Sequence, residues 1–172
     1  MPNPRGPVFE MSRELREECL AESRASPRRR MLLPVHRRQE AIVQRMVNFL
    51  QPGTYIQPHL HPRDWASETL HVMSGAIGFV TFDGHGEVRT TSRLGLGGLV
   101  DIEARVWHGV VALEEDTIIL EIKRGPYDDS DKVFAEWAPA ESAPAMTAYR
   151  DWLESLFSEV DGDSISPTGA KT

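Results

Sequence analysis

The chain has 172 residues, of which 40% are hydrophobic, enough for one globular domain with terminal extensions. Its formal net charge of −7 argues against a general binder of nucleic acids or anionic membranes. The single cysteine, Cys19, excludes an internal disulfide, and no apolar run is long enough for a signal peptide or a membrane span, so we expect a soluble cytoplasmic protein.

The N-terminal extension, residues 1–40, is predicted to contain one helix at residues 12–26. Ser12 can cap the helix, the residues after it are strong helix formers, and Pro27 ends it. The apolar positions lie on one side, which predicts that the helix rests on the surface of the domain. The basic run at residues 28–30 is either a solvated loop or a clamp for an anionic ligand.

Residues 41–125 have the pattern of an all-β domain. Short segments of β-branched and alternating residues are separated by turns, such as Asp83-Gly84-His85-Gly86. No helical pattern lies between these segments, which excludes a parallel α/β sheet and favours a sandwich or barrel. The predicted strands are residues 41–49, 68–73, 76–82, 87–91, 98–102, 110–113 and 117–123.

The C-terminal part is predicted to leave this sheet structure. Residues 126–160 contain a compact motif and then a helix, whose apolar residues Tyr149, Trp152, Leu153 and Leu156 are spaced as on one helix face. That face would pack on the barrel or on a second subunit. Residues 161–172 are polar and are predicted to be a disordered tail.

Two histidines and two later residues suggest a metal site. In a strand, side chains at i and i+2 point to the same side, so His59 and His61 would aim both imidazoles at one point. Glu68 opens the next predicted strand, and His108 precedes a later one. Three imidazoles and one carboxylate suit one divalent ion of iron, manganese, nickel, copper or zinc, and leave positions open on a six-coordinate ion.

The spacing of these residues resembles the first cupin motif. Gly53 is followed after five residues by His59-x-His61, then by Glu68, six further residues and Gly75. Six residues separate His61 from Glu68 where the usual motif has three or four, so the intervening loop is longer here.

A later segment resembles the second cupin motif. Gly97 is followed after five residues by Glu103-x-Arg105, two residues and His108. Glu103, Arg105 and Ala112 replace a usual proline, glycine and asparagine, which alters a turn. Together the two motifs imply an all-β, double-stranded β-helix (a cupin jelly roll) with short N- and C-terminal helices, in which the three histidines and the glutamate are the metal ligands.

A narrower resemblance covers residues 12–142, and its most distinctive part lies after the barrel. That part reads Glu121-x-Lys123-x-Gly125-Pro126-Tyr127, then Asp131-Lys132-x-Phe134-Ala135-x-Trp137-Ala138-Pro139-x-Glu141. Earlier matches are Ser26-Pro27-Arg28-Arg29-Arg30, Val43-Gln44-Arg45-Met46, Asn48, Pro52-Gly53-Thr54-Tyr55, Pro58-His59-x-His61, Phe82-Asp83 and Trp107-His108. In these residues the chain resembles the WbuC family of cupin-fold metalloproteins. That family is associated with bacterial gene clusters for surface polysaccharide (O antigen), and its biochemical activity is undefined.

Five residues near the ligand strand are candidates for substrate binding. Arg45, Asn48 and Tyr55 flank that strand. Arg45 and Asn48 have opposite parity, so both can face inward only if a bulge intervenes. Glu121 and Lys123 share parity on the last predicted strand and would form an inward pair, which either binds substrate or is structural.

The remaining histidines and the C-terminal motif are less informative. His36 is either a site residue or a surface or loop residue. His71 lies three positions after Glu68, hence on the opposite sheet face, and is expected to be structural. His85 lies in a turn and is expected to be exposed. The motif at residues 127–137 is expected to plug an open end of the barrel rather than to contact the ligand.

Two functions of different classes remain open. In one, the protein is a metal-dependent enzyme that isomerises, epimerises or oxidises a sugar or sugar nucleotide, with Glu121 or Tyr55 as general base. In the other, it is a non-catalytic module that binds a metal and a small ligand. A ligand set without cysteine favours an open site over a closed structural zinc site. The expected partner is a small molecule, neither nucleic acid nor membrane, and a homodimer is compatible with the cupin resemblance.

Overall fold

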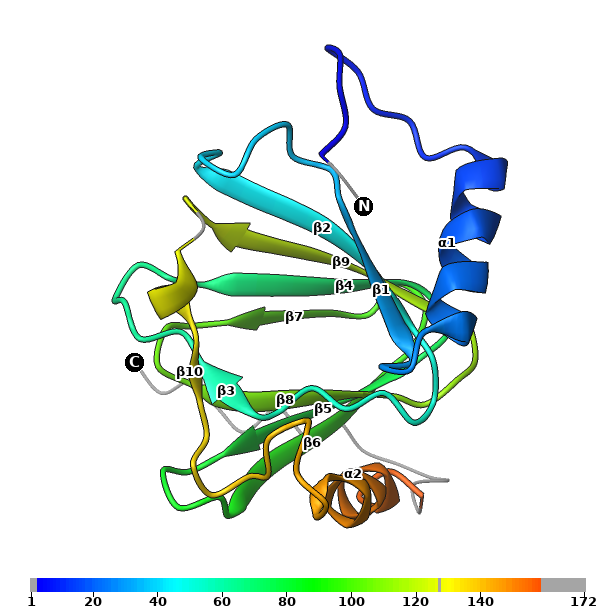
Figure 1. The fold of residues 1–172 in the computed structure, drawn as a ribbon. Helices are drawn as coiled ribbons and strands as arrows, with labels where there is room; N and C mark the ends of the chain where they lie inside the picture. Colours follow the sequence, from blue (N-terminus) through cyan, green and yellow to red (C-terminus); the bar gives the residue numbers. More distant parts are fainter. Residues whose placement is uncertain (1–2, 127, 159–172) are drawn as a thin grey trace.

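The computed structural model describes residues 3–126 and 128–158, and shows a β-structure with a helix at either side (Figure 1). Tyr127 and the predicted tail lie outside the described residues. The elements in chain order are α1 (Arg13–Ala25), β1 (Arg30–Pro34), β2 (Val43–Leu50), β3 (His59–Leu60), β4 (Glu68–Ser74), β5 (Ile77–Phe82), β6 (Val88–Leu94), β7 (Leu99–Ile102), β8 (Trp107–Ala112), β9 (Thr117–Arg124), the 3-10 turn η1 (Asp129–Asp131), β10 (Val133–Phe134) and α2 (Met146–Ser155).

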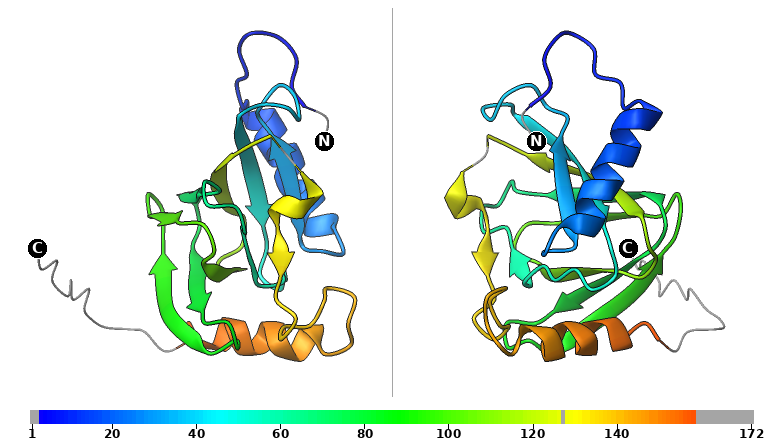
Figure 2. Two further views of the ribbon diagram at one scale, coloured as in Figure 1. Left: turned by 90° about the vertical axis from the view of Figure 1, so that its left-hand side faces the viewer. Right: turned by 45° about the vertical axis from the view of Figure 1, so that its right-hand side comes forward.

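The strands form two five-stranded antiparallel sheets. One has the order β1-β2-β9-β4-β7 and the other β10-β3-β8-β5-β6. From β2 to β10 the chain passes back and forth between the two sheets, except at the β5–β6 hairpin. The sheets face each other in Figure 2. This arrangement is a double-stranded β-helix, so the predicted all-β jelly roll of the cupin type is confirmed.

The main core lies between the two sheets and follows directly from the period-2 pattern of the strands. On β4, Leu70 and Val72 are buried, whereas Thr69, His71 and Met73 face outward. Their partners in the core are Leu50, Ile77, Phe79, Ile102, Val110, Ala112 and Ile119. Glu68 has the same parity as Leu70, so the fold directs its carboxylate into the interior.

The helix α1 covers the outer face of the first sheet, as its amphipathic pattern predicts. The Ser12 hydroxyl accepts a hydrogen bond from the Leu15 amide at 3.2 Å and caps the helix. Cys19 and Leu20 are buried against Val47 and Phe49 of β2. The opposite face of β2 therefore remains available to the interior, where the candidate site lies.

The helix α2 packs on the barrel through a smaller face than predicted. Leu153 and Phe157 are buried against Tyr55, Val80 and other core residues of the second sheet. Trp152, which the helical spacing places on the same face, is 38% exposed. Tyr149 and Leu156 of the predicted face do pack against this cluster, as does Met146, the first residue of the helix.

Three short strands were not predicted as such: β1, β3 and β10. β1 pairs with β2 at the edge of the first sheet. The two-residue strands β10 and β3 pair through Val133↔Leu60 and Phe134↔His59, and β3 also pairs with β8 through His59↔His108. A two-residue strand has no measurable period, so only its tertiary partner defines it. Strand β8 also begins earlier than predicted, at Trp107 instead of residue 110.

Candidate metal centre

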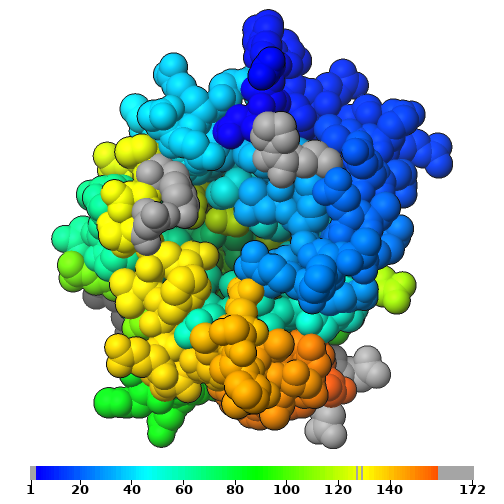
Figure 3. Space-filling model, viewed as in Figure 1, coloured from blue at the N-terminus to red at the C-terminus, as the bar shows by residue number. Residues whose placement is uncertain are grey.

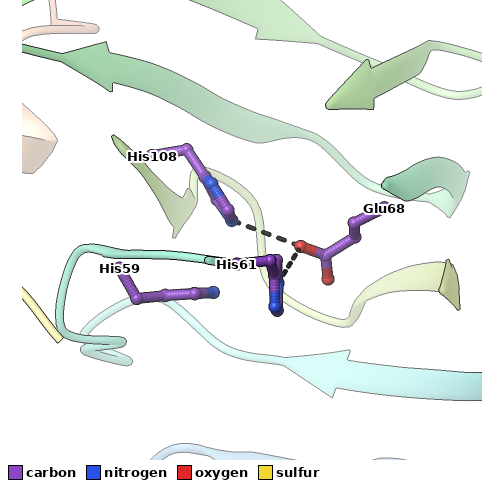
Figure 4. A group of neighbouring side chains, drawn as sticks. All are labelled: His59, His61, Glu68 and His108. Carbon is purple, nitrogen blue, oxygen red and sulfur yellow. Dashed lines mark hydrogen bonds and ion pairs between the residues drawn. The ribbon is translucent and has the colours of Figure 1, made fainter. Parts of the chain in front are cut away.

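Four side chains converge in the interior of the barrel. Each of these residues offers one potential ligand atom, and the four atoms lie within 4.8 Å of one another; the residues are His59, His61, Glu68 and His108. All four residues are buried, with exposed fractions of 6% or less. Figure 4 shows the histidines and the carboxylate pointing toward a common centre. The structure thus brings together the set that the two motifs predict.

The two sheets contribute different ligands to this centre. His59 lies on β3 and is the direct cross-strand partner of His108 on β8, which explains the ring-centroid distance of 4.4 Å between them. His61 follows β3 with the same parity. Glu68 is the first residue of β4 in the opposite sheet. A bound ion would therefore link the two sheets.

A backbone carbonyl orients each of the three imidazoles. The Nδ1 atoms of His59, His61 and His108 donate to the carbonyl oxygens of Gln57, Asp131 and Val106 at 3.1, 2.6 and 2.9 Å, respectively. A histidine that donates from Nδ1 presents the lone pair of Nε2 to the other side. The three Nε2 atoms are therefore the donor atoms offered to the centre.

The chemistry of this donor set fits a cation. The Glu68 Oε2 atom lies 3.1 Å from His61 Nε2 and 3.2 Å from His108 Nε2. With the Nδ1 protons engaged by carbonyls, each contact brings a carboxylate oxygen toward a nitrogen lone pair, which is favourable only if a positive charge lies between them. Three imidazoles and a carboxylate suit a transition-metal ion or zinc, for which Glu68 supplies the compensating charge. The residues present therefore fit one divalent metal ion.

Electrostatics in the centre support the protonation states that a metal requires. Burial, and then the nearby Lys132 ammonium, hold the pKa of His59 well below its ordinary value, so this imidazole is neutral at pH 7. Burial opposes ionisation of Glu68, but the imidazoles of His108 and His61, at 3.2 and 3.1 Å, outweigh burial and hold the pKa of the carboxyl well below its ordinary value. A neutral histidine and an ionised glutamate are metal-binding forms.

A pocket opens beside the four ligands. It encloses about 420 Å³ including its mouth to solvent. A recess is visible in Figure 3 between the yellow C-terminal segment and the blue N-terminal strands. Five apolar side chains form much of its wall: Leu50, Ile56, Leu70, Val110 and Ile119. The polar lining residues are Asn48, His59, Glu68, His108, Glu121 and Lys132.

Glu121 is the second carboxyl group in this pocket, and Asn48 and Lys123 accompany it. The Asn48 Nδ2 group donates to Glu121 Oε2 at 2.8 Å, and Lys123 Nζ lies 3.9 Å from Glu121 Oε1. Burial and the neighbouring Glu68 carboxylate raise the pKa of Glu121 to about 7. Glu121 and Lys123 share the inner face of β9 and are paired, as their parity predicts, although only Glu121 lines the pocket.

Two predicted pocket residues lie elsewhere. Arg45 is exposed on the outer side of β2, because Gln44, Met46 and Asn48 occupy the inner face of that strand. Tyr55 is buried in the core beneath α2, and its hydroxyl donates to the carbonyl oxygen of Pro139 at 2.7 Å. The expectation that Arg45 and Tyr55 line the ligand pocket is therefore wrong, and with it the role of Tyr55 as a general base there.

The other three histidines lie outside the centre. His36 lies in the loop after β1 and is 2% exposed, with its Nδ1 2.9 Å from the Arg45 carbonyl oxygen. It is therefore a buried loop residue, and it does not line the pocket. His71 lies on the outward face of β4, opposite Glu68. His85 is exposed in its turn, where its amide donates to Asp83. These positions agree with the expectations that His71 lies on the sheet face opposite Glu68 and that His85 is exposed in its turn.

The C-terminal motif does more than plug the barrel. The Asp131 carbonyl accepts from His61, Phe134 pairs with His59 across β10 and β3, and Lys132 lines the pocket. The sequence analysis expected this motif to plug an open end of the barrel and did not place Lys132 at the pocket. The signal available was the parity of Lys132 and Phe134, which places both on one side of a short extended segment next to a histidine strand.

A family model described as a domain of unknown function (DUF6016) matches residues 11–94. No curated protein matches the chain.

Many solved structures match the chain. KdgF from Halomonas sp. is 24% identical, with a TM-score of 0.46, over 58% of this chain and 81% of that one. Oxalate decarboxylase from Bacillus subtilis is 19% identical, with a TM-score of 0.49, over 61% of this chain. The oxalate decarboxylase of Lactobacillus farciminis in its formate complex is 17% identical, with a TM-score of 0.49, over 60% of this chain. This chain spans 27% and 30% of the two decarboxylases, respectively.

No helix in the part of the chain that the structure describes is long and apolar enough to cross a membrane.

Proposed function

We propose that this protein is a metal-dependent enzyme that acts on a small polar molecule bound in the pocket beside the four ligands. One observation carries the proposal. The wall that presents the candidate ligands His59, Glu68 and His108 also presents Asn48, Glu121 and Lys132 to the same open space. A metal that only staples two sheets needs no such pocket. A catalytic metal needs room for a substrate next to it.

The residues of this chain would have distinct roles in the reaction. The three imidazoles and Glu68 would hold the ion, which when bound polarises a substrate oxygen or activates water. Glu121 is the group placed for proton transfer, because it is a carboxyl inside the pocket that the ligand set leaves free. The Asn48 amide fixes its orientation by the 2.8 Å hydrogen bond. The apolar wall would exclude water around the reacting atoms.

The substrate we propose is a sugar derivative, in the setting of bacterial surface-polysaccharide synthesis. The support is the resemblance to the WbuC family, whose distinctive C-terminal residues form one side of the pocket here through Lys132.

The first experiment measures metal content by elemental analysis, on protein purified without chelator and without a metal-binding tag. We expect about one divalent ion per chain, lost in His59→Ala and His108→Ala. The matched control is His85→Ala, which removes an exposed histidine from a turn. A parent that binds no ion even after reconstitution would refute the proposal.

A second measurement separates an enzyme from a binding module. Glu121→Gln should keep the ion, because Glu121 is outside the ligand set, and should lose turnover of a panel of sugars and sugar derivatives. A loaded parent that is inert to the whole panel, and whose metal carries no exchangeable water, would favour the non-catalytic module.

A further inference from the structure

Lys132 is held at the pocket wall by the segment on which it lies. The preceding Asp131 is 8% exposed, its carbonyl accepts from His61 at 2.6 Å, and its carboxylate lies 2.9 Å from Arg63 Nε. Two residues after Lys132, Phe134 pairs with His59, and the Ala135 amide donates to the Pro58 carbonyl at 2.9 Å. The backbone of Lys132 is thus anchored on both sides, in a position from which its side chain lines the pocket.

The ammonium group has no ion-pair partner among the described residues. Its Nζ lies 5.9 Å from the centre of the Phe134 ring, a weak cation–π contact. The Glu121 and Glu68 carboxyl groups act on it electrostatically, but neither forms an ion pair with it. Both are also engaged already, Glu121 by Asn48 and Lys123, and Glu68 by the histidines. A partly buried cation without a partner is costly, unless something else in the pocket pairs with it.

The charges around the pocket leave it positive once a divalent ion is bound. Glu68 offsets half of the charge of the ion. Glu121, when ionised, is balanced by Lys123 at 3.9 Å, and Lys132 then adds a further positive charge. Protonation of Glu121 would make the excess larger, so the sign does not depend on its state. The five apolar lining residues strengthen the attraction for a negative group, because they lower the local dielectric constant.

We propose that the ligand of this pocket carries an oxyanion, a carboxylate or a phosphate, which binds the Lys132 ammonium while a neighbouring oxygen of the same molecule faces the metal centre. This deepens the proposed function and rests on it, since it names the class of the sugar derivative as acidic. A neutral sugar would leave Lys132 unpaired and the excess charge uncompensated. An oxyanion would pair with Lys132 and offset the excess positive charge through one charge-assisted contact.

The test is calorimetric titration of the metal-loaded protein with three probes that share one ring: glucuronate, glucose 6-phosphate and glucose. We expect the acidic sugars to bind and glucose to bind at least about tenfold more weakly. A preference between the two acidic probes identifies the carboxylate or the phosphate as the recognised group. Binding of glucose as tightly as both acids, or no binding of either acid at millimolar concentration, would overturn the inference.

Two variants assign the effect to Lys132. Lys132→Met keeps the aliphatic stem and should weaken the acidic sugar by about ten- to a hundredfold while leaving glucose unchanged. Lys132→Arg keeps the charge and should retain most of the affinity. The matched control is Arg45→Met, which removes a charge from the exposed outer face of β2. Equal affinity in Lys132→Met and the parent would refute the role of the lysine.

The metal content of each variant distinguishes the two possible failures. Lys132→Met should retain the ion of the parent, because Lys132 is not one of the four ligands. If the parent holds no ion, the proposed function fails. If the ion is present but the acidic sugars bind Lys132→Met as tightly as they bind the parent, only the oxyanion inference fails.

Discussion

His61 and Asp131 are 70 residues apart, and a hydrogen bond of 2.6 Å joins the imidazole Nδ1 of the first to the backbone carbonyl of the second. This bond connects the candidate metal centre to the segment that follows the barrel. It also sets which nitrogen of His61 faces Glu68. The C-terminal segment is therefore part of the site and not only a cover for it.

Removal of the Asp131 side chain should weaken metal binding, although that side chain is not a ligand. One carboxylate oxygen of Asp131 accepts from the Asp128 amide at 3.0 Å, and the other pairs with Arg63. Both contacts position the carbonyl that orients His61. In Asp131→Ala we expect metal affinity to fall by about ten- to a hundredfold, the range typical of residues behind a ligand, as measured by competition with a chelator.

Glu136→Ala is the control for this effect, because Glu136 is exposed in the same segment. It should bind the metal as the parent does. Circular dichroism of both variants checks that the fold is retained. Parent-like affinity in a folded Asp131→Ala would mean that the carbonyl holds its position without the side chain.

Loading with metal should raise the thermal stability of the protein. The four ligands come from both sheets, so the unfolded chain cannot bind the ion with the same set. Free metal at a hundred times its dissociation constant adds about 2.7 kcal/mol, which for a chain of this size raises the Tm by about 5–11 °C. Differential scanning calorimetry with metal and with chelator measures the shift. The His108→Ala variant should show none, and an equal rise there would place the stabilising metal elsewhere.

The Arg24–Asp116 pair should make a small part of the stability depend on acid pH. A hydrogen bond from Arg24, at 2.9 Å from its Nε, and a second from Gln51 hold the pKa of Asp116 below its ordinary value. A lowered carboxyl pKa contributes stability above the unfolded pKa of about 3.9 and loses it as the pH falls through the folded value. Asp116→Asn should therefore cost about 0.2–1 kcal/mol at neutral pH, a range that allows for the partial exposure of the pair, and almost nothing at about pH 2.

The substitution isolates the charge. Asp116 has φ 57°, a left-handed conformation that asparagine also tolerates, and the amide oxygen can still accept from Gln51. Urea unfolding at several pH values measures the difference. Glu115→Gln, which neutralises an exposed neighbouring carboxylate, should change stability less. A cost of Asp116→Asn that is the same at both pH values would show that the ion pair does not contribute.

Gly78 should be sensitive to substitution, because it contacts Phe157 in the turn that follows α2. A Cβ atom at Gly78 would lie 2.5 Å from the Phe157 ring, which is itself buried. Gly78→Ala should cost about 1–3 kcal/mol in urea unfolding. Combining it with Phe157→Leu should recover part of that loss, because the two residues share one space. Gly84→Ala, where nothing lies within 4 Å of the added Cβ, is the neutral control. Additive effects in the double variant would show that the helix moves away instead.

Strand alternation predicted the sheet interior and placed His59 and His61 on one face, whereas Glu68 and His108 were named as ligands by the resemblance to the two cupin motifs. Alternation along a strand sets which side chains share a face, and this parity requires no knowledge of the partner strand. It placed Glu121 and Lys123 together and His71 opposite Glu68. It also stated that Arg45 and Asn48 could not both face inward.

Only the tertiary structure determined which of Arg45 and Asn48 faces inward, and which other residues surround the candidate metal ligands. The covering of Val47 and Phe49 by α1 leaves Asn48 to the pocket and Arg45 to solvent. Packing beneath α2 removes Tyr55 from the site, and the two-residue pairing of β10 with β3 brings Lys132 into it. These positions depend on contacts between segments tens of residues apart, whose register no local period encodes. Parity is a property of one strand, whereas a pocket is a property of the elements that meet around it.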